Sequence, residues 1–321
     1  MKKNYAPIAC FCYNRPDKIR KVLDALAKCA EAPKTDLIVF SDAPRNVADE
    51  ESILAVRKFL HRVKGFKSVT IKERKTNYGL SINLIDGIDS VLTQYDRVIV
   101  CEDDIIVTPC FLTFMNKALD VYKPIKKILT ISATIPFEGE SNSNSVLFGE
   151  IAGCWGWATW RDRWALYEKN TEKSFNELRD MELRKRLNMD NRVNIAWQID
   201  ANFRQERNSW AVYLNYAAVK YNKLNAYPPK TIVKNIGQDG SGIHGAHSET
   251  VESQNLDVAS LQFPTEHITD TLLPILDPIL NNMQLRPNIE RYNNWVYNPT
   301  AKKNKNKSKI RRNFRILRGK E

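Results

Sequence analysis

The sequence has no long hydrophobic run. Although 43% of its 321 residues are hydrophobic, none of its apolar stretches approaches the ~18 consecutive residues that a membrane-spanning helix needs. Its six cysteines form no Cys-x-x-Cys pair, so the pattern favours reduced core thiols over a zinc site or a disulfide framework. The N-terminus passes into an apolar segment at residue 7 without a signal-peptide pattern, and we therefore expect a cytoplasmic protein.

Net positive charge is small outside one segment. The formal net charge is +12, but residues 302–321 contain ten basic residues against Glu321 and so hold +9 of it. The remaining +3 is spread over 301 residues, which argues against a nucleic-acid-binding body. We expect no nucleic-acid partner, and we assign the basic character to a tail.

The first half of the chain alternates strand and helix patterns. Apolar, β-branched runs predict strands at 7–13, 36–40, 69–72, 97–101 and 128–132, and amphipathic runs predict helices at 17–30, 50–63, 81–92 and 109–122. Such β-α units are typical of a mostly parallel, Rossmann-like nucleotide-binding sheet with helices on both faces. The second half is less regular, with helices predicted at 175–187 and 194–204.

This pattern divides the chain into three parts. We expect a nucleotide-binding half over 1–134, an acceptor and catalytic half of the same domain over 135–297, and the basic tail over 298–321. Within the first part, polar side chains follow the strands: Asn14-Arg15, Ser41-Asp42 and Glu102-Asp103-Asp104. Because the carboxyl ends of parallel strands lie at one edge of a sheet, these three clusters are predicted to meet there.

The Glu102-Asp103-Asp104 cluster follows a strand that is expected to be buried. Three adjacent carboxylates repel one another and lose hydration, so a fold retains them where a cation is available. Carboxylate oxygens select hard ions such as Mg²⁺ or Mn²⁺, which in turn hold substrate phosphates. The alternative is a solvated turn between the strand and the helix that follows.

Residues 151–164 contain four tryptophans and two glycines. Aromatic faces stack on sugar rings, and glycines such as Gly153 and Gly156 allow a backbone to approach a ligand closely. Trp155 and Trp157 are therefore candidates for ligand contact, with a packed core hinge as the alternative, whereas Trp160 and Trp164 are expected to pack. A glycine-rich segment over 235–247 contains His244. His244 is a candidate for contact with phosphate or metal, and an ordinary loop histidine without a ligand is the alternative.

Together these segments resemble the GT-A-fold glycosyltransferases, nearest to the N-acetylglucosaminyltransferase I type and to family 2-like bacterial enzymes. The resemblance spans about residues 5–250 and rests on these matches: Ile8 to Arg15, Ser41-Asp42, Asn77-Tyr78-Gly79-Leu80-Ser81, Glu102-Asp103-Asp104 with Val107-Thr108-Pro109-Cys110-Phe111, Gly153 to Trp157, Trp197 to Asp200, and Ile236 to Gly245. Of the family's Trp-Asp-Asp segment, Asp200 is the single aspartate present. The resemblance implies a GT-A fold and a hexosyltransferase that uses a nucleotide-sugar.

The resemblance also assigns roles to individual residues. Arg15 would contact the diphosphate and Asp42 the uracil, while Gly153 to Trp157 would lie beside the donor sugar. Asn77 would belong to the nucleotide side of the site. The segment Ile236 to Gly245, with His244, would close over the donor.

The expected chemistry accounts for the carboxylates. Transfer expels a diphosphate, and Mn²⁺ or Mg²⁺ anchored by Asp104 would stabilise its charge. Glu102 or Asp103 would accept hydrogen bonds from sugar or ribose hydroxyls. An inverting transfer also needs a general base for the acceptor hydroxyl. Asp200 is the predicted base, and Asp162 and Glu150 are its rivals.

The tail combines basic residues with an apolar stripe formed by Ile310, Phe314 and Leu317. This pattern is typical of a short amphipathic helix on an anionic membrane surface; RNA contact or a tail without a partner are the alternatives. The sequence thus predicts a bacterial enzyme on the inner face of the cell membrane that adds a UDP-sugar to a glycan or lipid-linked acceptor. The alternative functions are a nucleotidyltransferase-like enzyme and a non-catalytic sugar- or nucleotide-binding protein.

Overall fold

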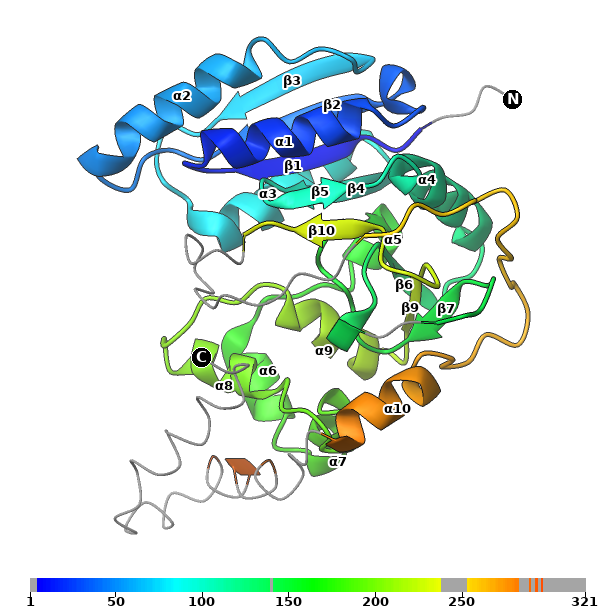
Figure 1. Cartoon of the computed structure of the whole chain (residues 1–321). Coiled ribbons are helices and arrows are strands. Elements are labelled where there is room, and N and C mark those ends of the chain that lie inside the picture. The colour runs from blue at the N-terminus through cyan, green and yellow to red at the C-terminus, as the bar shows by residue number, and fades with distance from the viewer. Residues whose placement is uncertain are drawn as a thin grey trace.

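A computed structural model describes residues 5–138, 141–237 and 253–282, together with residues 289, 292, 293 and 296. Within them, an eight-stranded sheet has the order β3-β2-β1-β4-β8-β6-β9-β7 (Figure 1). The strands are β1 (Ile8–Cys12), β2 (Asp36–Ser41), β3 (Ser68–Glu73), β4 (Arg97–Glu102), β6 (Ile128–Ser132), β7 (Leu147–Gly149), β8 (Trp157–Trp160) and β9 (Leu224–Tyr227). A separate two-stranded ribbon pairs β5 (Ile105–Val107) with β10 (Val233–Asn235).

Most strands of the large sheet run in one direction. The pairs β1–β2, β1–β4, β2–β3 and β6–β9 are parallel. Strand β8 lies antiparallel between β4 and β6, and β7 is antiparallel to β9. The carboxyl ends of β1, β2 and β4 therefore share one edge, as the β-α pattern predicted.

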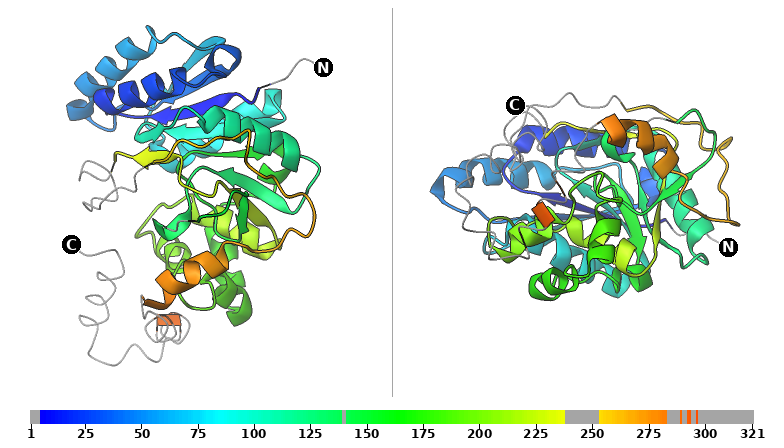
Figure 2. Two further views of the ribbon diagram at one scale, coloured as in Figure 1. Left: turned by 45° about the vertical axis from the view of Figure 1, so that its right-hand side comes forward. Right: turned by 90° about the horizontal axis from the view of Figure 1, so that it is seen from below.

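Helices connect the strands and cover both faces of the sheet, as Figure 2 shows from two further directions. They are α1 (Pro16–Ala27), α2 (Glu50–Leu60), α3 (Gly79–Gln94), α4 (Phe111–Tyr122), α5 (Arg161–Trp164), α6 (Thr171–Glu177), α7 (Met181–Leu187), α8 (Trp197–Phe203), α9 (Val212–Lys220) and α10 (Leu273–Asn282). Short 3₁₀ turns occur at Ala32–Lys34, Val47–Asp49 and Pro136–Glu138.

Alternation along β1 explains the two layers of helices. Ile8 and Cys10 pack in a core cluster with α1, α2 and α4, whereas Ala9 and Phe11 face a second cluster with α3. Successive strand residues point to opposite faces, so a strand covered on both sides is apolar throughout. The predicted fold class, an α/β fold with a mostly parallel sheet and helices on both faces, is confirmed.

The second half differs from the sequence prediction in detail. The single helix predicted over 175–187 is two helices, α6 and α7, because Asp180 caps the start of α7 by accepting hydrogen bonds from the backbone of Glu182 and Leu183. These helices, with α8, α9 and α10, surround a third apolar cluster. The strands β5, β7, β8, β9 and β10, each of three or four residues, were not predicted, and neither were the helices α5, α9 and α10.

None of the helices in the described residues is long and apolar enough to cross a membrane. The basic tail over 298–321 lies outside the described residues, as does His244.

Candidate functional site

The strand-end cluster forms because β1 and β4 are neighbours in the sheet. Phe11 pairs with Glu102, so the residues that follow each strand emerge side by side. The Arg15 guanidinium contacts the Asp103 carboxylate and lies 3.0 Å from Asp104 Oδ2. Asp103 is 3% exposed and also accepts a 3.2 Å hydrogen bond from the Tyr13 backbone N–H. Two of the three predicted clusters thus meet in a network of charged side chains.

The cluster retains excess negative charge. Burial, followed by the charges of Asp104 and Asp103, raises the pKa of Glu102 to about 8. Burial also raises the pKa of Asp103, although the Arg15 guanidinium opposes this shift. One guanidinium therefore does not balance three neighbouring carboxylates, and the cluster favours a further positive charge nearby.

The third cluster is tied to the start of α3. Asp42, at the end of β2, accepts hydrogen bonds from the backbone N–H groups of Tyr78 at 2.9 Å and Gly79 at 2.8 Å. Its Oδ2 also lies 3.3 Å from Asn77 Nδ2, which donates a second hydrogen bond, of 2.7 Å, to the Ala43 carbonyl. Asp42 and Asn77 are thus brought together, and Asp42 fixes where α3 begins. The contact between Asp42 and uracil stays a prediction.

A neighbouring network was missed by sequence reasoning. The Tyr13 hydroxyl and the Asn14 amide both donate to the Asp49 carboxylate, each at 2.7 Å. The Arg45 backbone N–H donates to the Tyr13 hydroxyl at 2.9 Å. These bonds hold the segment after β2 against the segment that contains Arg15. Asp49 carries no local signal of this role, because its partners lie far away in the sequence.

The β5–β10 ribbon brings a distant segment to Asp104 (Figure 1). The Ile236 backbone N–H donates to the Asp104 carbonyl at 2.8 Å. Gly237 lies so close that a Cβ atom built on it would overlap Asp104 Oδ2. The first residues of the predicted donor-closing segment therefore contact the acidic cluster, and glycine is needed for this approach.

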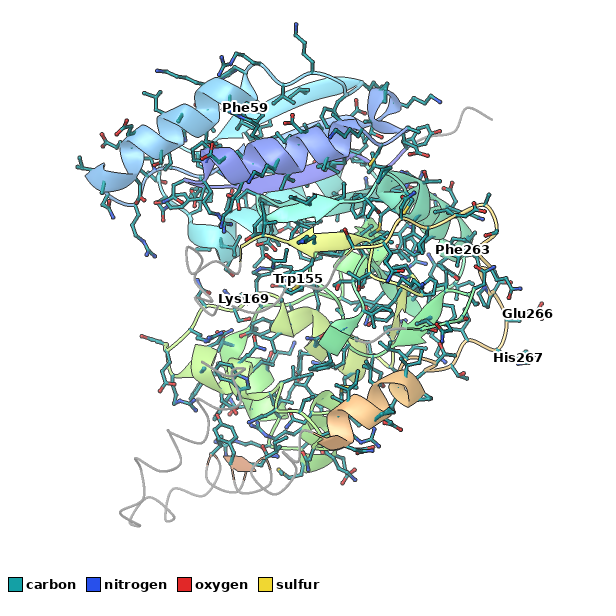
Figure 3. The ribbon with its side chains drawn as sticks, viewed as in Figure 1. Phe59, Trp155, Lys169, Phe263, Glu266 and His267 are labelled. Atoms are coloured by element: carbon teal, nitrogen blue, oxygen red, sulfur yellow. The ribbon has the colours of Figure 1, made fainter. Side chains whose placement is uncertain are left out.

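The tryptophan-rich segment splits into two environments. Gly153 donates its N–H to Ser132 Oγ at 3.1 Å, and Gly156 adopts a positive φ of 63°. Trp155 is half-buried and lies below β10 in Figure 3. Trp157, in contrast, is 1% exposed and its ring centroid lies 5.8 Å from that of Trp210. The prediction that Trp157 contacts ligand is thus corrected: its indole packs in the core.

Trp160 and Trp164 are also buried, as expected of packing residues. Cys154, between Gly153 and Trp155, has its pKa raised to about 12 by burial and by the charge of Glu102. Its thiol is therefore protonated at neutral pH. All six cysteines are free thiols.

Asp200 has different surroundings from those predicted for a general base. Its side chain is 0% exposed and forms a two-point ion pair with Arg184, which is also fully buried. Arg184 Nε in turn donates to Asn293 Oδ1 at 2.7 Å. A base must touch the acceptor hydroxyl, and an enclosed carboxylate cannot do so in this conformation. The structure explains Asp200 as an ion-pair partner that joins α7 to α8.

Both rivals of Asp200 are more accessible. Asp162 forms an ion pair with Lys126 at 2.6 Å. It comes two residues after Trp160, the last residue of β8, and Trp160 pairs with Arg97 at the start of β4. Asp162 therefore lies at the opposite edge of the sheet from Glu102. Glu150 is half-buried, and its carboxylate lies 2.7 Å from Arg186. Glu150 follows Gly149, which pairs with Asn225 near the start of β9, so by the same strand directions it too lies toward that edge. Of the two, Glu150 is closer in sequence to the glycine-containing segment at Gly153.

The carboxylate oxygens of the acidic cluster suit a hard cation that is also coordinated by the phosphates of a bound substrate. In the described part of the chain, no group of three His, Cys, Asp or Glu side chains is arranged to enclose a metal ion. Mg²⁺ usually binds through one or two carboxylates and the phosphates of a substrate, without a protein cage. Asp104, which is 17% exposed, fits that kind of binding.

Comparisons with known proteins give distant likenesses. No family model matches the chain, and neither does any curated protein sequence. Among solved structures, S. aureus TarS is 16% identical over 36% of this chain and 20% of that chain, with a TM-score of 0.28. TarS residues 1–349 align at 12% identity over 43% of this chain and 42% of that chain, with a TM-score of 0.29.

A third similar structure is TarS 1–349 in complex with UDP-GlcNAc, at 15% identity over 39% of this chain and 33% of that chain, with a TM-score of 0.29. The chain thus spans less than half the length of the TarS structures it matches. Likenesses at this level identify neither a family nor an activity.

Proposed function

We propose that the protein is a metal-dependent glycosyltransferase that uses a nucleotide-sugar, with UDP as the nucleotide. One observation carries the proposal: three segments that the resemblance assigns to donor binding meet at Asp104. Arg15 comes from the end of β1, Asp104 from the end of β4, and Gly237 from the segment after β10. Each motif is weak alone, but their contact in space is not required by their positions in the sequence.

The residues at this junction suit a diphosphate leaving group. Asp104 would hold Mn²⁺ or Mg²⁺, which supplies positive charge to the departing phosphates when bound. Arg15 offers further N–H donors for a phosphate oxygen. Glu102 and Asp103 supply acceptors, of which Glu102 is the more exposed and so the better placed for a sugar or ribose hydroxyl.

We propose inverting transfer, which requires a base on the acceptor side. Because Asp200 is enclosed, Glu150 is the stronger candidate of the three carboxylates considered. Its side chain is half-buried, and its carboxylate lies 2.7 Å from the exposed Arg186 side chain. Glu150→Gln should then lower transfer while leaving UDP affinity unchanged.

The acceptor and the location of the protein form part of the same proposal. A glycan or lipid-linked acceptor of a bacterial surface polysaccharide would be presented at the inner face of the cell membrane. The basic tail over 298–321 would hold the enzyme there, since each Lys or Arg near an anionic surface contributes ~1 kcal/mol. The protein would thus be cytoplasmic and peripheral.

A hydrolysis screen over UDP-, GDP- and dTDP-sugars, with and without Mn²⁺, tests the activity. Release of UDP from a UDP-sugar with Mn²⁺ present supports a glycosyltransferase. Exchange of pyrophosphate into a nucleoside triphosphate would instead indicate a nucleotidyltransferase. Metal-dependent UDP binding in calorimetry, without turnover of any donor or acceptor, would indicate a sugar- or nucleotide-binding protein.

A further inference from the structure

Arg15 occupies a position at the acidic cluster that a bound cation would compete for. We propose that Arg15 is an internal counter-ion: it blocks Asp104 from binding a divalent cation alone, and a nucleotide diphosphate releases that block. Metal and nucleotide would then bind together and not one by one. This inference rests on the proposed function, because it concerns the same site.

The two carboxylates that Arg15 contacts differ in accessibility. The Asp103 side chain is 4% exposed and has a second partner in the Tyr13 backbone N–H. The Asp104 side chain is 17% exposed, and that of Arg15 is 22% exposed. The Arg15–Asp103 contact is thus the more enclosed of the two, and the contact with Asp104 is the one that an incoming ion can reach.

Access to one oxygen of Asp104 is limited from two sides. Arg15 Nη2 lies 3.0 Å from Oδ2, and the Gly237 backbone lies against the same oxygen. A cation that binds Oδ2 must therefore displace the guanidinium, because Gly237 is held by the hydrogen bond from the Ile236 N–H to the Asp104 carbonyl. Arg15 would stay close by on Asp103, and its positive charge would repel the incoming cation until a further anion binds the guanidinium.

A diphosphate removes this conflict. The guanidinium has five N–H donors in a planar fork, which matches phosphate oxygens as well as carboxylates. The contacts with Asp103 and Asp104 both use Nη2, so the other nitrogens remain for a phosphate. Once a phosphate neutralises Arg15, Asp104 can exchange its partner for the metal.

Free Mn²⁺ titrations, followed by the electron paramagnetic resonance signal of unbound Mn²⁺, test the inference on the full chain. Wild-type protein and Arg15→Gln are compared, with and without UDP. Arg20→Gln is the matched control, because Arg20 is an exposed arginine of α1 that lies over Phe59. Arg15→Lys keeps the positive charge and should behave like the wild type towards Mn²⁺ alone.

Arg15→Gln should bind Mn²⁺ alone roughly tenfold more tightly than the wild type, because one positive charge within about 4 Å of the ligand is removed. It should also lose most of the gain in Mn²⁺ affinity that UDP gives the wild type. Unchanged or weaker Mn²⁺ binding by Arg15→Gln, relative to Arg20→Gln, would overturn the counter-ion role.

Two further outcomes separate this inference from the proposed function. If the wild type binds UDP with Mn²⁺ but Arg15→Gln gains no Mn²⁺ affinity, the counter-ion role falls and the proposed function stands. If the wild type binds no UDP even with Mn²⁺, the proposed function falls as well. Should Arg15→Gln fail to fold, weaker Mn²⁺ binding by Arg15→Lys than by the wild type would overturn the inference, because the two have equal charge.

Discussion

Gly237 lies against the carboxylate of Asp104, although the two residues belong to opposite halves of the chain. The contact depends on the β5–β10 ribbon, which starts one residue after Asp104 and ends two residues before Gly237. It joins the acidic cluster to the segment expected to cover the donor. Glycine at position 237 therefore leaves room for the Asp104 carboxylate, which a larger side chain would displace.

Gly237→Ala should weaken Mn²⁺-dependent UDP binding by about tenfold or more, because the added methyl group displaces Asp104 from its position beside Arg15. Calorimetry with UDP and Mn²⁺ measures this effect. Gly65→Ala is the control: Gly65 has a φ of 95°, so the change should cost stability without altering UDP affinity. Equal UDP affinity of Gly237→Ala and the wild type would contradict the assigned contact.

Asp42→Asn should destabilise the protein by about 1–2 kcal/mol, because the carboxylate accepts hydrogen bonds from the backbone at the start of α3 and an amide nitrogen cannot. Urea unfolding gives the free energy. Asp17→Asn, on the exposed first turn of α1, should change it by a few tenths at most. A fully stable Asp42→Asn protein would show that the contacts at α3 are dispensable.

Asp200→Asn should mainly lower the free energy of unfolding, and any loss of activity should follow from that loss of stability. Removing one partner of a buried ion pair typically costs 3–5 kcal/mol, because the other charge is left unpaired. The double variant Asp200→Leu with Arg184→Met should be more stable in urea than Arg184→Met alone. A stable Asp200→Asn protein whose transfer rate falls by ~10²–10⁴ would restore the general-base hypothesis.

Truncation after Pro299 should release the protein from anionic liposomes while leaving the melting temperature and donor hydrolysis nearly unchanged. Binding of the full chain should also weaken steeply with salt, because exposed charges are screened within ~10 Å at 0.1 M. Liposome sedimentation at two salt concentrations measures both effects. Equal sedimentation of the truncated and full chains would rule out the tail as a membrane anchor.

The first half of the chain was largely predictable because its signals are local and repeated. The β-branched run Val98 to Cys101 predicts β4, and the polar residues that follow each strand predict the shared edge. Strand β8 was missed since Trp157 to Trp160 is short and aromatic, and its antiparallel placement between β4 and β6 has no local signal. The apolar segment around Asp200 was correctly predicted to be helical.

The contacts of individual site residues were less predictable. The local pattern at Trp197 to Asp200 suggested a base, but the partner that buries Asp200 is Arg184 on a different helix. In the same way, Asp49 joins the site through Tyr13 and Asn14, and no spacing in the sequence indicates this. Pairings between distant segments are set by tertiary packing, which residue order alone does not specify.

The most direct measurement is UDP binding by Asp104→Asn, with and without Mn²⁺, followed by calorimetry. Asparagine retains the shape of the side chain but loses the charge that would anchor the cation. We expect Asp104→Asn to lose Mn²⁺-dependent UDP binding while its melting temperature stays within a few degrees of the wild type. Unchanged Mn²⁺-dependent affinity would contradict the central claim that the strand-end cluster is a metal and nucleotide site.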